Sequence, residues 1–215
     1  MSPVVAIVGK TGSGKTQLIE KLIPEFKRRG YRVATVKHSP AGMDLDKQGK
    51  DSWRFAEAGS DAVVVSSPDK LACIKKVDHD SSIEEIQHLI GNDFDLVLLE
   101  GFKKGKAPKI EVHRKETGTD LVCPVELLSA IVSDELLDSN VPQFPLGDTG
   151  AVADFIEKKF VLEDKTDTSL FINGMQVFMK PFVKDIIARA VLAMVSTLKG
   201  AGEIKNLDIS IRNKH

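Results

Sequence analysis

Val4-Val5-Ala6-Ile7-Val8-Gly9-Lys10-Thr11-Gly12-Ser13-Gly14-Lys15-Thr16 is the stretch that decides the fold. Its first five residues form a continuous apolar, β-branched run, which predicts a strand buried on both faces, as in a parallel sheet. From Gln17 to Arg29 apolar residues recur at helical spacing, which predicts a helix. A glycine loop between a strand and a helix lies at the carboxyl end of the strand, where open α/β sheets bind their ligands.

The loop matches the pattern Gly-x4-Gly-Lys-Ser/Thr, which predicts a phosphate cradle. Glycines allow the backbone angles that aim successive N–H groups at phosphate oxygens, and the helix start adds its positive dipole end. Lys15 is expected to reach the β- and γ-phosphates of a nucleotide, and Thr16 to place its hydroxyl on Mg²⁺. The predicted nucleotide-binding residues here are Gly9, Lys10, Thr11, Gly12, Ser13, Gly14, Lys15, Thr16 and Gln17.

Lys10 has two interpretations. In one class of P-loop proteins a lysine five residues before the cradle lysine reaches across a dimer to the nucleotide of the partner. An ordinary solvated lysine is the alternative, because most lysines are exposed.

A P-loop also needs a carboxylate to hold the Mg²⁺ shell or to orient water. Glu100 ends the apolar run 94–99, whereas Asp95 begins that run and falls on the wrong side of a parallel sheet. Glu100 is therefore the predicted catalytic and metal-binding partner of Lys15 and Thr16. Gly101, next to it, is expected to offer its backbone to the γ-phosphate.

A second polar cluster follows the predicted strand 32–36 and faces the same crevice. Asp44 or Asp46 is expected to reach Mg²⁺ through water, and Asp46 is the metal-binding candidate. His38 is expected to contact phosphate or a second substrate, with a solvated loop as the alternative.

Guanine recognition needs a carboxylate that accepts from N1–H and the 2-amino group. Many GTPases supply this carboxylate from an Asn/Thr-Lys-x-Asp motif, which lies after the strand that corresponds to the Glu100 strand. The nearest match here, residues 75–78 (Lys-Lys-Val-Asp), lies before the Glu100 strand, so we reject it as the guanine-binding motif. Asp134 follows the predicted strand 130–132, which comes after the Glu100 strand, so its position along the chain is that expected of a guanine-binding carboxylate. The alternative role of Asp134 is to cap a helix at 135–137.

The rest of the chain alternates strands and helices, which implies βαβ units. We expect an α/β P-loop NTPase with a mostly parallel sheet flanked by helices, ending in a helix at 149–160. This domain spans residues 1–162. A hairpin around Asn173-Gly174, a helix from Pro181 and a strand at 206–212 predict a small C-terminal ββαβ domain at 166–215.

Bulk composition excludes several classes of protein. The net charge is −1, so no global positive field favours nucleic acid. Two isolated cysteines, Cys73 and Cys123, indicate neither a disulfide framework nor a thiolate metal knuckle. Neither a signal peptide nor an apolar run of membrane-spanning length is recognisable, so we expect a cytoplasmic protein without membrane contact.

Further motifs stand in order behind the cradle and resemble the MobB family of molybdopterin-guanine dinucleotide biosynthesis proteins. They are Lys37-His38, Gly49-Lys50-Asp51-Ser52-x-Arg54, Ala58-Gly59, Leu99-Glu100-Gly101-Phe102-Lys103 and Pro108-Lys109-Ile110. The resemblance covers roughly residues 3–160. It implies a dimeric GTP-binding protein with weak GTPase activity that assists a guanylyltransferase in joining GMP to molybdopterin.

Two features depart from the family pattern: Lys10, and the tail from about residue 166, to which the resemblance assigns no role. The basic residues Lys103 and Lys104, continued by Lys106 and Lys109, are expected to attract the phosphate of a pterin cofactor. A solvated loop is the alternative.

Two other functions remain open at this point. One is a nickel-type metallochaperone GTPase of similar architecture, which needs Cys and His ligands. The other is a small-molecule kinase with the loop 39–50 as its lid. Hydrolysis of GTP is expected to be slow, because the sequence shows no obvious arginine finger, for which Arg54 and Arg114 are no more than possibilities.

Overall fold

The computed structural model describes residues 2–42, 46–162, 168–173, 175–204 and 207–211. The chain divides into two compact units. Residues 1–37 and 83–215 form the main unit, and residues 38–82 form the small unit.

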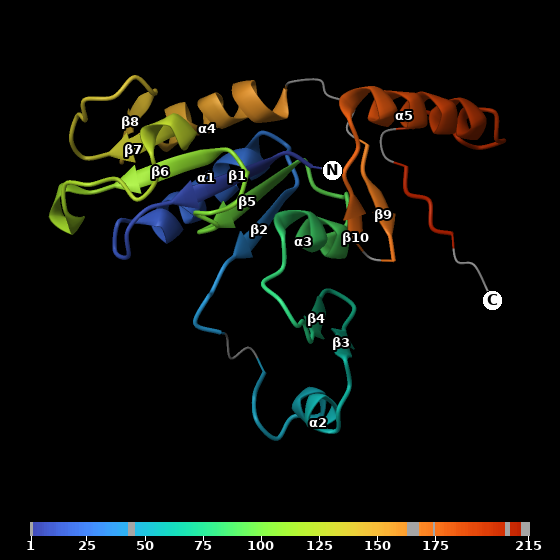
Figure 1. Ribbon diagram of the computed structural model, residues 1–215. Coiled ribbons are helices and arrows are strands. Elements are labelled where there is room, and N and C mark those ends of the chain that lie inside the picture. Colours follow the sequence, from blue (N-terminus) through green and yellow to red (C-terminus); the bar gives the residue numbers. More distant parts are fainter. Residues whose placement is uncertain (1, 43–45, 163–167, 174, 205–206, 212–215) are drawn as a thin grey trace. The chain divides into compact units, whose positions relative to one another are not determined.

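The main unit is built on one six-stranded sheet (Figure 1). Its strands, in spatial order, are β2 (Val33–Lys37), β5 (Leu96–Glu100), β1 (Val4–Val8), β6 (Lys109–His113), β7 (Leu128–Ser133) and β8 (Gln143–Pro145). Every neighbouring pair is parallel. The mostly parallel sheet predicted from the sequence is therefore confirmed, with β8 as an added edge strand that the sequence did not indicate.

Helices cover the sheet because each strand presents alternate residues to opposite faces. On one face, Val5 and Ile7 of β1 pack with α1 (Lys15–Arg28) and α4 (Thr149–Ile156). On the other face, Ala6 and Val8 pack with α3 (Ile83–Ile90) and with the loops that follow β5, β6 and β7. The helix predicted at 149–160 ends as a π-helical turn over Glu157–Val161. Two 3-10 turns, Lys115–Thr117 and Val125–Leu127, lie in the loops after β6.

An ionic cluster joins the end of α1 to the π-helical turn. Arg29 pairs with Glu25 and Glu157, and the Tyr31 hydroxyl donates to Glu157 at 2.6 Å. Hydrogen bonds from Arg28 and Arg29 lower the pKa of the Glu25 carboxyl to about 2. The hydrogen bond to Glu157 raises the pKa of Tyr31 to about 12.

The small unit holds α2 (Asp51–Glu57) and an antiparallel pair, β3 (Ala62–Ser66) with β4 (Leu71–Lys75). The two strands form a sheet of their own, separate from the six-stranded sheet.

The tail begins with the predicted hairpin, β9 (Leu170–Ile172) paired antiparallel with β10 (Met175–Val177). The predicted helix follows as α5 (Pro181–Ser196), with proline in its first turn. The rings of His88 on α3 and Phe171 on β9 stack at 4.3 Å between centroids. The predicted last strand is wrong over residues 207–211, which have no regular structure; residues 206 and 212 lie outside the described residues.

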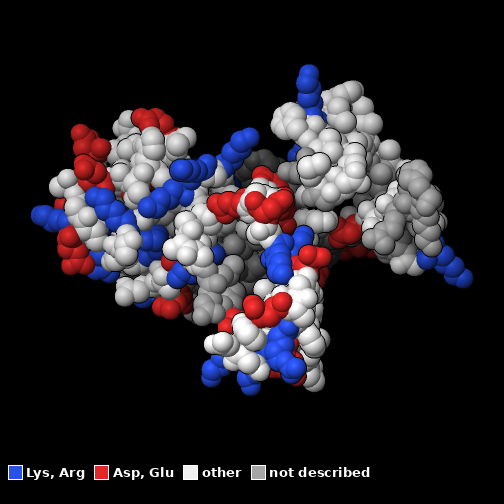
Figure 2. All heavy atoms as spheres, turned by 60° about the horizontal axis from the view of Figure 1, so that its bottom comes forward, with Lys and Arg blue, Asp and Glu red and all other residues white. Residues whose placement is uncertain are grey.

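The predicted boundary between residues 162 and 166 falls on 163–167, outside the described residues. A separate C-terminal domain at 166–215 therefore stays a prediction. Across the described ranges, no helix has both the length and the apolar character needed to cross a membrane. The face drawn in Figure 2 mixes cationic and anionic groups, in keeping with the net charge of −1.

Candidate functional site

The predicted cradle connects β1 directly to α1. Gly9, Gly12 and Gly14 have φ values of 146°, 82° and 98°, which L-residues with a side chain rarely adopt. Gly9 is needed for a second reason, because a Cβ there would lie 2.3 Å from the backbone oxygen of Val112 on β6. The cradle thus packs so closely against the end of the neighbouring strand that the chain has no room for a side chain.

Lys15, at the start of α1, turns its ammonium group back over the cradle. Its Nζ donates to the carbonyl oxygens of Lys10 at 2.7 Å and Gly9 at 3.2 Å. Burial lowers the pKa of this ammonium group, an effect opposed by Glu100. Nearby Lys103 also lowers it. A cation among backbone N–H groups at a helix N-terminus is the arrangement that binds a phosphate.

Thr16 and Glu100 meet at the carboxyl end of the sheet, as the sequence predicted. Thr16 Oγ1 donates to Glu100 Oε2 at 3.0 Å, although 84 residues separate them in the chain. Lys37 Nζ at the end of β2 lies 3.8 Å from Glu100 Oε1. A hydroxyl and a carboxylate are the oxygen ligands that Mg²⁺ prefers beside substrate phosphates, so these residues fit that ion. Bound there, Mg²⁺ would neutralise phosphate charge.

Arg114, in the loop after β6, forms a hydrogen bond with the backbone of the cradle. Its Nε donates to the backbone oxygen of Ser13 at 3.1 Å, and its guanidinium lies 3.5 Å from the position of a Cβ on Gly14. Lys10 extends in the opposite direction, from the cradle to this loop, since its Nζ lies 2.9 Å from the position of a Cβ on Gly118. The sequence singled out Arg114 only as a possible arginine finger, and its contact with Ser13 was missed.

Gly101 and Asp134, two other predicted site residues at this edge of the sheet, each form a hydrogen bond with a backbone group. The Gly101 N–H donates to Ile7 O at 3.0 Å, so in this structure it serves the sheet and is not free for a γ-phosphate. Asp134 follows β7 as predicted, and its Oδ1 accepts from the N–H of Lys115 at 3.0 Å. The alternative helix cap is wrong, because residues 135–137 form no helix.

Three side chains of β6 are buried although they are charged or polar: Lys109, Glu111 and His113. The sequence did not single them out as buried. Lys109 Nζ donates to Gly105 O at 2.5 Å and Ala107 O at 3.2 Å. Glu111, 1% exposed, accepts from the N–H groups of residues 122 and 123. His113 Nε2 lies 3.1 Å from Glu135 Oε1. Each of these side chains fixes one of the loops around the site.

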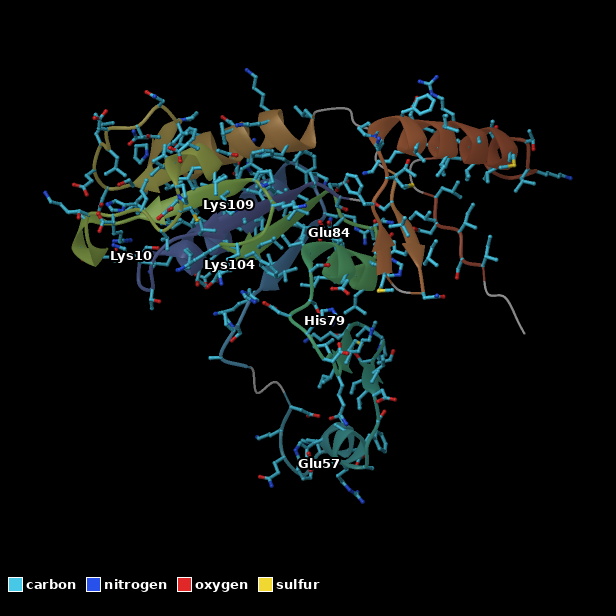
Figure 3. All side chains as sticks on the ribbon, in the orientation of Figure 1. Lys10, Glu57, His79, Glu84, Lys104 and Lys109 are labelled. Carbon is cyan, nitrogen blue, oxygen red and sulfur yellow. The ribbon has the colours of Figure 1, made fainter. Side chains whose placement is uncertain are left out.

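This finding corrects the basic run expected after Glu100. Lys109 is 4% exposed and its ammonium group is occupied by backbone oxygens, so it does not attract a ligand phosphate. Lys103, Lys104 and Lys106 are exposed. Lys10 and Lys104, labelled in Figure 3, follow the carboxyl ends of β1 and β5.

The remaining candidates belong to the small unit. His38 Nε2 lies 3.0 Å from both carboxylate oxygens of Asp80. Asp46 Oδ1 accepts from Ser52 Oγ at 3.0 Å, and Asp46 Oδ2 is shielded from solvent with no hydrogen-bond partner among the described residues. Asp44 lies outside the described residues. The parts of Asp46 and His38 in the site stay predictions.

A parallel sheet, a glycine cradle between its first strand and helix, and a lysine over that cradle define a P-loop fold. The family model described as "Molybdopterin guanine dinucleotide synthesis protein B" matches residues 4–134, more than half of the chain. The chain therefore belongs to this family, MobB.

Individual relatives agree with this assignment. The molybdopterin-guanine dinucleotide biosynthesis adapter protein of Haemophilus influenzae is 38% identical over 156 residues, 72% of this chain and 88% of that protein. A putative adapter protein from Methanocaldococcus jannaschii is 26% identical and aligns over 97% of both chains. A crystal structure of molybdopterin-guanine biosynthesis protein B (mobB), 31% identical, superimposes with a TM-score of 0.56 over 72% of this chain and 98% of that one.

Proposed function

We propose that this protein binds GTP with Mg²⁺, hydrolyses it slowly, and acts as an adapter in the attachment of GMP to molybdopterin. The observation that carries the proposal is the meeting of Thr16 Oγ1 and Glu100 Oε2 beside the Lys15 cradle. The relatives named as biosynthesis adapter proteins supply the pathway.

Phosphate binding follows from the chemistry of the cradle. Lys15 is held by the carbonyl oxygens of Gly9 and Lys10, and an anion offers its ammonium group a stronger, charge-assisted partner. Thr16 and Glu100 would hold Mg²⁺ next to the terminal phosphates. Glu100 also stands where a carboxylate could orient the attacking water.

Guanine recognition is assigned to Asp134. Its loop follows β7, at the same carboxyl edge of the sheet as the cradle, which follows β1. The Asp134 carboxylate accepts from a backbone N–H, and a guanine N1–H and amino group would be donors of the same kind. Discrimination against ATP follows, because adenine presents no such pair of donors on that edge.

Hydrolysis of GTP is expected to be slow because the two candidate arginines already have other partners. Arg114 is occupied by Ser13 O and by Glu116 at 3.7 Å, and Arg54 lies in the small unit beside Asp51. Without an arginine on the transferring phosphoryl group, rates fall by about 10³–10⁵. The protein would then act mainly in its GTP-bound form.

Further roles concern the cofactor and the partners. Exposed Lys103 and Lys104 would attract the phosphate of molybdopterin. His38 would contact phosphate or a second substrate, and Asp46 would reach Mg²⁺ through water. A guanylyltransferase of the same pathway, a second copy of the chain and the cytoplasm are the proposed surroundings. Exposed apolar residues on both strands of the small unit, such as Val64 and Leu71, support association with another protein.

A reconstituted assay tests the adapter role. The guanylyltransferase of the pathway, molybdopterin, GTP and Mg²⁺ are mixed with the wild-type protein or with Lys15→Ala, and the dinucleotide product is measured. The wild type should raise the yield of product and Lys15→Ala should not. A yield that is independent of the protein would refute the adapter role.

A matched pair of variants tests the basic residues. The Lys103→Ala/Lys104→Ala variant should bind molybdopterin more weakly than the wild type, while Lys158→Ala/Lys159→Ala, on the π-helical turn, should not. Equal binding by both variants would remove Lys103 and Lys104 from the proposal.

A further inference from the structure

A buried histidine lies at the carboxyl end of the sheet, where β6 and β7 end side by side. His113 ends β6 and is the register partner of Ser133, which ends β7. Both residues are buried, 2% and 6% exposed. A buried imidazole needs a hydrogen-bond partner, because an unpaired polar group away from water costs free energy. The chemistry proposed for the cradle does not use this histidine, so its presence there needs another explanation.

The histidine contacts Glu135, which follows directly on the carboxylate assigned to guanine, that of Asp134. The distance from His113 Nε2 to Glu135 Oε1 is 3.1 Å. A carboxylate accepts hydrogen bonds, so Nε2 is the donor. The N–H of Glu135 also donates to Ser133 Oγ at 3.1 Å. Glu135 is therefore fixed through its backbone and its side chain, and the turn over residues 133–135 is held at both ends.

The residues that follow His113 link this turn to the phosphate cradle. Arg114 Nε donates to Ser13 O at 3.1 Å, and the N–H of Lys115 donates to Asp134 Oδ1 at 3.0 Å. A carboxylate accepts several hydrogen bonds, so Asp134 can keep the one from Lys115 while it accepts from a base. The direction in which Asp134 faces a base then depends on the turn that carries it. One strand end therefore fixes both the cradle and the base-reading turn.

We infer that His113 and Glu135 are positioning residues for guanine recognition, because their hydrogen bond holds the turn that presents the Asp134 carboxylate to the base. The inference rests on the proposed assignment of guanine recognition to Asp134. Breaking this hydrogen bond should reduce the selectivity between bases and leave phosphate binding intact, since Lys15 and Thr16 are held by other contacts. A histidine that served only the stability of the sheet would leave the selectivity between bases unchanged.

Affinities of the full-length protein for GTP and for inosine triphosphate, both with Mg²⁺, measure this selectivity. The two nucleotides differ only in the 2-amino group of guanine, a donor to the base-reading carboxylate. A hydrogen bond to a charged group contributes a factor of about ten or more, so the wild type should prefer GTP by at least that factor. Glu135→Ala should bind the two nucleotides within about threefold of each other, with its affinity for inorganic tripolyphosphate unchanged.

Three further variants separate the hydrogen bond from other effects. Glu126→Ala, which removes an exposed carboxylate from the 3-10 turn before β7, is the matched control and should keep the preference for GTP. Glu135→Gln retains an acceptor for His113 and should keep the preference as well. His113→Leu removes the donor and should lose the preference to the same extent as Glu135→Ala. The melting temperature of Glu135→Ala should stay close to that of the wild type, because the Glu135 side chain is 29% exposed.

The outcomes distinguish this inference from the proposed function. A wild-type protein that binds GTP and inosine triphosphate equally would refute guanine recognition by Asp134, and the inference with it. A wild-type preference for GTP that survives Glu135→Ala or His113→Leu would overturn the inference alone. So would an equal loss of GTP, inosine triphosphate and tripolyphosphate binding, which indicates a general structural role. Loss of the preference in Glu135→Gln would also overturn it, because that result indicates a direct contact of Glu135 with the base.

Discussion

Replacing Gly9 by alanine tests whether the cradle is fitted to the sheet as closely as described. The new methyl group would lie 2.3 Å from Val112 O and 2.7 Å from Ser13 Oγ. Val112 O belongs to the backbone of a buried strand and cannot rotate away. Overpacking of this kind costs ~1–3 kcal/mol, and a residue other than glycine at a φ of 146° costs ~1–3 kcal/mol more.

We therefore expect Gly9→Ala to lower the free energy of unfolding by about 4 kcal/mol. For a chain of 215 residues, each kcal/mol lowers the melting temperature by about 2–4 °C, so the loss is about 8–16 °C. Calorimetry or circular dichroism in the absence of nucleotide measures it.

Gly12→Ala is the matched control in the same loop. Gly12 also has a positive φ, but a Cβ there would meet no atom within 4 Å. Its cost should be only the ~1–2 kcal/mol of a left-handed backbone. Equal melting temperatures for the two variants would refute the close packing of the cradle on β6.

Three further outcomes follow from particular side chains. Glu111→Ala leaves the N–H groups of Val122 and Cys123 buried without an acceptor and should cost about 2–5 kcal/mol in thermal unfolding, whereas exposed Glu116→Ala should cost almost nothing. Asp134→Asn should weaken GTP binding and favour xanthosine triphosphate, measured by competition; unchanged preference would remove Asp134 from base recognition. The lowered pKa of Glu25 stabilises the folded state above about pH 4.5, and this stabilisation is lost as the pH falls toward 2. The raised pKa of Tyr31 stabilises the folded state below pH 10.0, and this stabilisation is lost as the pH rises toward 12. Melting temperatures of Glu25→Gln and Tyr31→Phe should therefore approach the wild-type value at the acid and alkaline limits respectively, and a difference independent of pH would contradict both assignments.

The local part of the fold could be predicted from the sequence because its signals are local. The apolar run 4–8, the glycines and the helical spacing after Lys15 each act over a few residues, and together they place the cradle. The meeting of Thr16 and Glu100 also followed, since the carboxyl ends of parallel strands share one edge of the sheet. The edge strand β8 was missed because Gln143-Phe144-Pro145 is short and has no apolar run.

The loops could not be predicted, because they are fixed by contacts between distant residues. Lys109 looks in the sequence like one more lysine of a basic run, and only the folded loop brings Gly105 O and Ala107 O to its ammonium group. His113 and Glu135 are 22 residues apart, and neither belongs to a motif. The alternation of polar residues in Lys109–His113 was the available signal, since it places all three on one face of the strand.

The most direct test of the central claim is a calorimetric titration of GTP, with Mg²⁺, into the wild-type protein and into Lys15→Ala. Lys158→Ala serves as the control lysine, because this residue lies on the π-helical turn and not in the cradle. The wild type and Lys158→Ala should bind GTP, and Lys15→Ala should lose that binding. Equal affinity of Lys15→Ala and the wild type, or no binding by the wild type, would contradict the account.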